Sequence, residues 1–179
     1  PDGSAMFAKW MAPLLVFLLV PAPAPRARDF LTAEEVEGIQ GAPGIDARIT
    51  LYMDAAERRL RSAAERVTGV ESGEGDPLEF LTPEEMLEDY LRILRSVMFA
   101  VDDAFQEPKR AKGDVPTALR RLKGRTGELI ERLRDLRRLS EEKRREPLWN
   151  LVAQADEITR AARDGAEEGL SLLRSRRSR

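Results

Sequence analysis

The chain has 179 residues, 42% of them hydrophobic and 35% charged, and its formal net charge is −2. This length and this balance fit a single folded domain, and they exclude an intrinsically disordered chain and a multi-span membrane protein. Cysteine and histidine are both absent, which excludes disulfides, a thiol nucleophile and the commonest ligand of transition metals.

The first 27 residues have the pattern of a secretory signal peptide. Lys9 supplies a positive charge, the apolar run MAPLLVFLLV follows, and PAPAPRA then ends any helix before small residues. The run is shorter than the roughly 20 residues that span a bilayer. We predict an upstream scar plus signal peptide over 1–27, cleavage near Ala27, and a secreted or bacterial periplasmic protein. The alternative is a buried apolar helix.

Two similar stretches, DFLTAEEV and EFLTPEEM, occur in the chain. In each, a threonine (Thr32 or Thr82) stands where a helix N-cap belongs, and a glutamate (Glu35 or Glu85) follows three residues later. This spacing is a capping box, in which the threonine hydroxyl and the glutamate carboxylate each accept from the other residue's backbone amide. We therefore predict that both stretches start helices.

The LTxxE pattern resembles the LTxxQ signature of small periplasmic helical proteins, the family of chaperones and stress sensors typified by Spy and CpxP, with glutamate in place of glutamine. The resemblance implies a chaperone-like or stress-sensing role. That role would need an exposed apolar surface on a dimer, to which Met86, Met98, Phe99 or the face of the fourth helix would contribute. The first stretch and its continuation also resemble uncharacterised secreted helical proteins with DFLT at the mature N-terminus, which implies no activity.

Apolar residues recur at helical spacing along the rest of the chain, and no strand pattern competes. The pattern predicts an all-α fold, a bundle of four long helices plus one short N-terminal helix, in one domain over 28–173 with a basic disordered tail at 174–179. The expected helices are 33–40, 45–68, 83–107, 116–139 and a fifth, introduced by Ser140 or Pro147, that ends near 174.

The fourth expected helix carries a regular seam of leucines. Such a seam needs an antiparallel neighbour in its own chain or a coiled-coil partner across a dimer. The sequence leaves both alternatives open.

Charge is distributed unevenly along the chain. Residues 28–107 hold 19 acidic and 8 basic residues, whereas 108–145 hold 6 acidic and 14 basic residues. The second block predicts a basic interaction face that would bind an anionic partner. The alternative is a solvated helix face whose positive charges are balanced by the acidic helices beside it in the same bundle. Nucleic acid is disfavoured because aromatic residues do not alternate with the arginines. The candidate face consists of Arg120, Arg121, Arg125, Arg132, Arg134, Arg137 and Arg138.

Paired acids are the best candidates for an enzyme. Asp102 and Asp103 would bind a divalent cation or perform acid–base chemistry if they faced the inside of the bundle. The alternatives are solvent exposure or, for Asp102, burial in an ion pair with an arginine such as Arg58 or Arg59. A di-iron site of the helical-bundle type is excluded because it needs Glu-x-x-His pairs and the chain has no histidine.

The sequence thus predicts a non-catalytic secreted or periplasmic bundle without a cofactor or a bound metal. Its expected role is interaction with a protein partner, self-association or scaffolding. A chaperone-like or stress-sensing role is one alternative, and a divalent-metal enzyme using Asp102 and Asp103 is another.

Overall fold

A computed structural model describes residues 29–106 and 112–177. The predicted signal peptide and its cleavage site lie outside these ranges. Within them the chain forms five α-helices and no strand, which confirms the all-α fold class.

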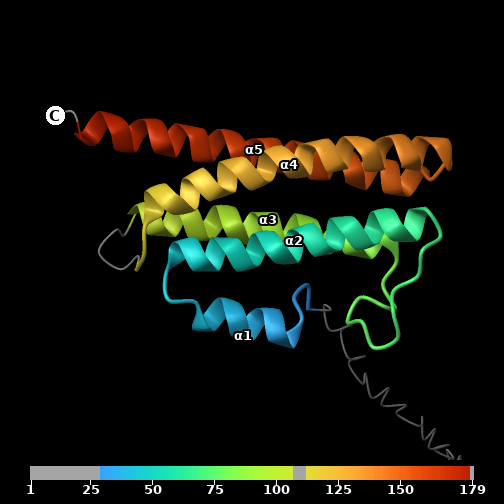
Figure 1. The fold of residues 1–179 in the computed structure, drawn as a ribbon. Coiled ribbons are helices and arrows are strands. Elements are labelled where there is room, and N and C mark those ends of the chain that lie inside the picture. The colour runs from blue at the N-terminus through green and yellow to red at the C-terminus, as the bar shows by residue number, and fades with distance from the viewer. Residues whose placement is uncertain (1–28, 107–111, 178–179) are drawn as a thin grey trace, which may run out of the picture.

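The helices alternate in direction along the chain (Figure 1). Helices α2 and α3 form one layer, α4 and α5 form a second, and α2 packs on α4 while α3 packs on α5. The short α1 lies outside these layers and contacts α2. The helix bounds are Ala33–Gly41 for α1, Ile45–Val67 for α2, Pro83–Gln106 for α3, Val115–Glu142 for α4 and Glu146–Arg177 for α5.

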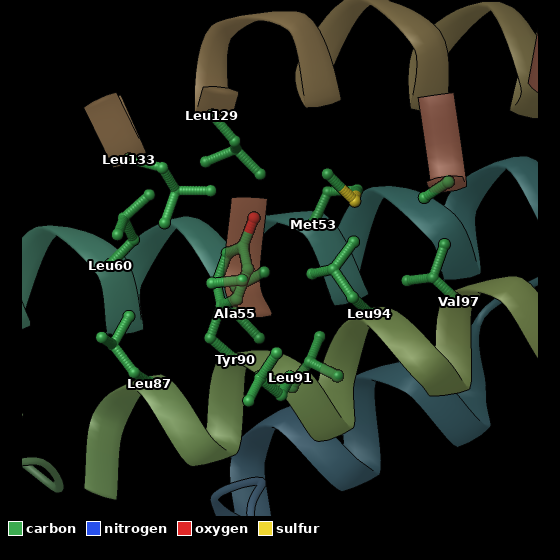
Figure 2. Close-up of a cluster of buried hydrophobic side chains, with 14 of the residues drawn as sticks. Met53, Ala55, Leu60, Leu87, Tyr90, Leu91, Leu94, Val97, Leu129 and Leu133 are labelled. Atoms are coloured by element: carbon green, nitrogen blue, oxygen red, sulfur yellow. The ribbon is translucent and has the colours of Figure 1, made fainter. Parts of the chain in front are cut away.

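The core lies between the two layers, where the apolar faces of the helices meet. Met53 and Leu60 of α2 and Leu94 of α3 face Leu129 and Leu133 of α4, and each side chain is at most 1% exposed (Figure 2). The leucine seam of α4 is therefore buried inside its own chain.

A buried hydrogen bond joins the two layers. Tyr90 of α3 has its hydroxyl directed toward the α4–α5 layer (Figure 2), 2.7 Å from Oγ1 of Thr159 on α5. Because Thr159 donates its own proton to the carbonyl of Ala155 at 2.6 Å, Tyr90 is the donor of the bond between them. Burial raises the pKa of Tyr90, so the phenol stays protonated and the bond fixes α3 against α5.

The turn between α4 and α5 differs from the sequence prediction. We expected a helix end at 139 and a fifth helix introduced by Ser140 or Pro147, but α4 continues past Ser140, whose Oγ donates to the carbonyl of Arg137 at 2.7 Å. The chain turns at Arg144, which has a φ of 54°. Pro147 is the second residue of α5, where a missing amide proton leaves no helical bond unmade.

Candidate functional site

The two similar stretches are helix starts in the structure. Thr32 Oγ1 accepts from the amide of Glu35 at 3.2 Å, and the Glu35 carboxylate accepts from the amide of Thr32 at 2.8 Å. Thr82 and Glu85 repeat both bonds, at 3.2 and 2.8 Å.

The first of these stretches also holds a buried ion pair. The guanidinium of Arg59, on α2, is 1% exposed; both of its terminal nitrogens donate to Glu35, Nη2 at 2.7 Å, and Nη2 also donates to the carbonyl of Phe30 at 3.0 Å. Burial opposes the charge on Glu35, but the bonds from Arg59 and from the amide of Thr32 outweigh it and lower its pKa. We call this contact the α1 clamp, because it holds α1 on α2.

Both stretches border one surface hollow of about 550 Å³. Leu31 of the first stretch and Phe80 and Leu81 of the second line it, with Arg59 among the lining residues. The one nitrogen of Arg59 without a hydrogen-bond partner, Nε, is itself buried, so a molecule in the hollow would not reach it. The hollow is therefore better explained by the packing of the α1 clamp than by a ligand.

Three arginines of the predicted basic face turn toward α2. Arg125 contacts Asp54 at 2.9 Å and Glu57 at 2.6 Å, Arg132 contacts Glu57 at 2.8 Å, and Arg121 donates to a threonine hydroxyl of the same helix. Burial disfavours the charge of Arg125, yet bonds and attraction from both carboxylates prevail and raise its pKa. Arg125 and Arg132 thus form ion pairs with acidic residues of the neighbouring α2, and Arg121 forms a hydrogen bond with a threonine of that helix.

The other four arginines are exposed and contact acids of their own segment. The pairs are Arg120 with Asp114 at 4.0 Å, Arg134 with Glu131, Arg137 with Glu141 at 3.1 Å, and Arg138 with Asp135 at 3.8 Å. Arg137 also lies 5.8 Å from the centre of the Trp149 ring. The seven arginines thus lie on different sides of α4 and do not form one open face for an anion.

The paired acids of α3 do not face a common site. Asp102 and Asp103 are both exposed, and they border different hollows of the surface. The proposed pairing of Asp102 with Arg58 or Arg59 is wrong, because these arginines contact Glu35. In the described ranges, no three or more acidic side chains gather as a metal site would require.

A groove runs between the C-terminal halves of α3 and α5, with a volume of about 300 Å³. It exists because small residues of α5 leave space beside α3. Nothing lies within 4 Å of a Cβ built on Gly165, whereas a Cβ on Gly169 would meet the Phe105 ring at 3.1 Å. The lining includes Met98, Val101, Phe105, Ala161, Gly165 and Leu172. We call this feature the α3–α5 groove.

The rim of the α3–α5 groove is acidic. Asp102 of α3 and Glu168 of α5 border it, and neither has an ion-pair partner in the part of the chain that the structure describes. Phe99, three residues before Asp102, is 74% exposed. Sequence reasoning missed this site because it depends on how α3 and α5 pair, although the small residues of α5 were a visible sign of close helix packing.

The apolar surface expected for a chaperone-like role is partly absent. Met86 is fully buried, so its predicted contribution is wrong, and the apolar face of α4 is buried too. Met98 borders the α3–α5 groove and Phe99 is exposed.

None of the described helices combines the length and the apolar character needed to cross a bilayer. Comparison with protein-family models, with curated proteins and with solved structures gave no match to this chain.

Proposed function

We propose that the protein is a non-catalytic interaction module. Its four long helices act as one bundle that α1 braces through the α1 clamp, and the α3–α5 groove receives a segment of a protein partner. The arrangement of α2 with α3 and α4, and of α5 with α3 and α4, supports the bundle.

The observation that carries this proposal is the α3–α5 groove itself. Contact of water with the apolar surface at Met98, Val101 and Leu172 is unfavourable. A partner side chain that covers this surface stabilises the complex by roughly 25 cal/mol per Å² of apolar area removed from water. The carboxylates of Asp102 and Glu168 add selectivity, because they attract a cation to the rim. A segment with apolar residues on one side and lysine or arginine beside them matches both properties.

The probe for this proposal is a synthetic amphipathic helix made of leucine and lysine. Its matched control has the same leucine pattern with glutamate in place of lysine. We expect fluorescence anisotropy to show binding of the lysine peptide and not of the glutamate peptide. Equal binding of the two, or binding of neither, would contradict the proposed site.

Two glycines allow a matched pair of variants. Gly165→Leu fills the α3–α5 groove, whereas Gly124→Leu makes the same change at an exposed position of α4; no atom lies within 4 Å of a Cβ at either site. We expect the lysine peptide to lose affinity for Gly165→Leu and to keep it for Gly124→Leu. Loss of affinity in both variants would mean that the substitutions act by destabilising the fold and not by filling the α3–α5 groove.

We also propose that the protein acts outside the inner membrane, on the evidence of the signal-like pattern in the sequence alone. Expression of the whole chain in a bacterium, followed by intact mass measurement of the periplasmic fraction, tests this. Mature protein beginning near Arg28 is the expected product. Recovery of only the uncleaved chain from the cytoplasm would refute it.

A further inference from the structure

We infer that the basic residue which a protein partner places at the rim of the α3–α5 groove is an arginine, held between the ring of Phe99 and the carboxylate of Asp102. This inference rests on the proposed function and narrows the chemistry of its partner. It also assigns a role to Phe99, a large aromatic side chain that the bundle leaves exposed.

Phe99 and Asp102 lie on one face of α3. Side chains three residues apart on a helix are neighbours, with Cβ atoms about 5–6 Å apart. Phe99 also precedes Gln106 by seven residues, about two turns of helix, and both Asp102 and Gln106 line the α3–α5 groove. The phenyl ring therefore stands at the edge of the groove beside the carboxylate, and a segment bound in the groove passes both.

Both groups are accessible to a partner. Phe99 is 74% exposed, and Asp102 is exposed as well. In the part of the chain that the structure describes, Asp102 has no ion-pair partner and no cation lies over the Phe99 ring. Contact of a large aromatic ring with water is unfavourable, so a partner that covers Phe99 gains free energy from the apolar area it buries.

The chain contains a ring and a carboxylate that hold one guanidinium at another place on its surface. Arg137 lies 5.8 Å from the centre of the Trp149 ring, and its Nε donates to the carboxylate of Glu141 at 3.1 Å. Phe99 and Asp102 supply a ring and a carboxylate of the same kind on α3. In the complex, the partner supplies the arginine.

Arginine fits this pair of groups better than lysine does. Its guanidinium is planar, so one face stacks on an aromatic ring while the edge donates two parallel hydrogen bonds to a carboxylate. The ammonium of lysine is a compact, strongly hydrated charge without a flat face. We expect arginine to be preferred by about 2–5-fold in affinity, which is the effect of one exposed cation–π contact.

A cation of α3 itself limits where the arginine of the partner lies. Arg95 is exposed and stands four residues before Phe99, so it lies one turn earlier on the same side of the helix. Its charge repels a second guanidinium from that end of the ring, whereas Asp102 attracts one at the other end. The arginine is therefore directed to the Asp102 side of the phenyl ring.

The test compares the leucine–lysine peptide with one in which every lysine is replaced by arginine. Fluorescence anisotropy should show that the unaltered protein binds the arginine peptide about 2–5-fold more tightly. Phe99→Leu keeps an apolar side chain but removes the ring, and Asp102→Asn removes the charge, so each should abolish this preference. Phe80→Leu and Asp103→Asn are the matched controls and should keep it, because Phe80 is an exposed ring before α3 and Asp103 borders a different hollow.

The outcomes separate this inference from the proposed function. Equal affinity for the two peptides overturns the arginine site and leaves the interaction module standing, whereas binding of neither peptide overturns both. A preference that survives Phe99→Leu overturns the role of the ring. Phe99→Tyr retains an aromatic ring and should retain the preference, and circular dichroism of each variant distinguishes a lost contact from a lost fold.

Discussion

Replacing Glu35 with glutamine removes one charge from the α1 clamp and exchanges one of the two carboxylate oxygens that accept from Arg59 for an amide nitrogen, which cannot accept. Glutamine also serves in a capping box, so the bond to the amide of Thr32 is kept. The buried guanidinium of Arg59 then has a neutral partner in place of a carboxylate.

The size of the effect follows from the burial of Arg59. Removing one partner of a buried ion pair destabilises a protein by about 3–5 kcal/mol, because the other charge stays buried without compensation. The amide oxygen of glutamine still accepts one bond, which offsets about 1 kcal/mol. We expect the free energy of unfolding of Glu35→Gln to fall by about 2–4 kcal/mol, a loss of roughly 5–15 °C in Tm for a domain of this size.

Urea unfolding followed by circular dichroism measures this change. Glu34→Gln is the matched control: Glu34 is the neighbouring residue in the same first turn, but it is exposed and makes no ion pair with another described residue. It should lose about 0.5 kcal/mol, the value of a charge near a helix N-terminus. Equal losses in the two variants would refute the reasoning, since they would show that Arg59 does not depend on the charge of Glu35.

The same pair predicts a dependence on pH. The pKa of Glu35 is lowered in the folded protein from an ordinary value of 4.5, so its contribution to stability is fully present above that value and is lost as the pH falls through the lower, folded pKa. The gap between the wild-type protein and Glu35→Gln should therefore be constant near neutral pH and shrink in acid. A gap that grew in acid would contradict this sign.

Three further changes have expected outcomes in the same urea assay. Gly124→Ala should raise the free energy of unfolding by about 0.5–1 kcal/mol, because this exposed helix position has open space where the methyl group would lie; a loss would mean that the site is packed. Thr159→Val should lower it by about 1–3 kcal/mol, because the buried hydroxyl of Tyr90 loses its acceptor; an unchanged value would show that the phenol finds another partner. Arg125→Ala should lower it by about 1 kcal/mol, and exposed Arg138→Ala by less than about 0.5; equal effects would remove the distinction between the two groups of arginines.

The sequence was sufficient to predict the fold class, because every long element has an apolar face with helical spacing. It was also sufficient to place the starts of α1, α2 and α3, where threonine caps, glycines and Pro83 stand directly before or at the first turn. The turn between α4 and α5 was missed for a physical reason. Its left-handed residue is Arg144, whereas glycine or asparagine is the usual signal for that conformation.

The site was harder to predict because it depends on which helices become neighbours. The basic stretch of α4 is continuous in sequence, but Arg125 faces the acids of α2 and Arg138 faces solvent. In the same way, Gly165 and Gly169 look equivalent in sequence, yet the second is packed against Phe105 and the first leaves the α3–α5 groove open. These differences arise from tertiary packing, which local patterns do not record.

The connections between the helices also set an order of folding. Three residues join α4 to α5, whereas fifteen join α2 to α3, so closing the α4–α5 hairpin costs about 1.4 kcal/mol less in chain entropy than closing the α2–α3 hairpin. We expect the α4–α5 hairpin to be formed in the transition state and α2–α3 to complete later. Leu136→Ala should then mainly slow refolding, and Leu87→Ala should mainly speed unfolding, in stopped-flow measurements; the reverse pattern would assign the nucleus to α2 and α3.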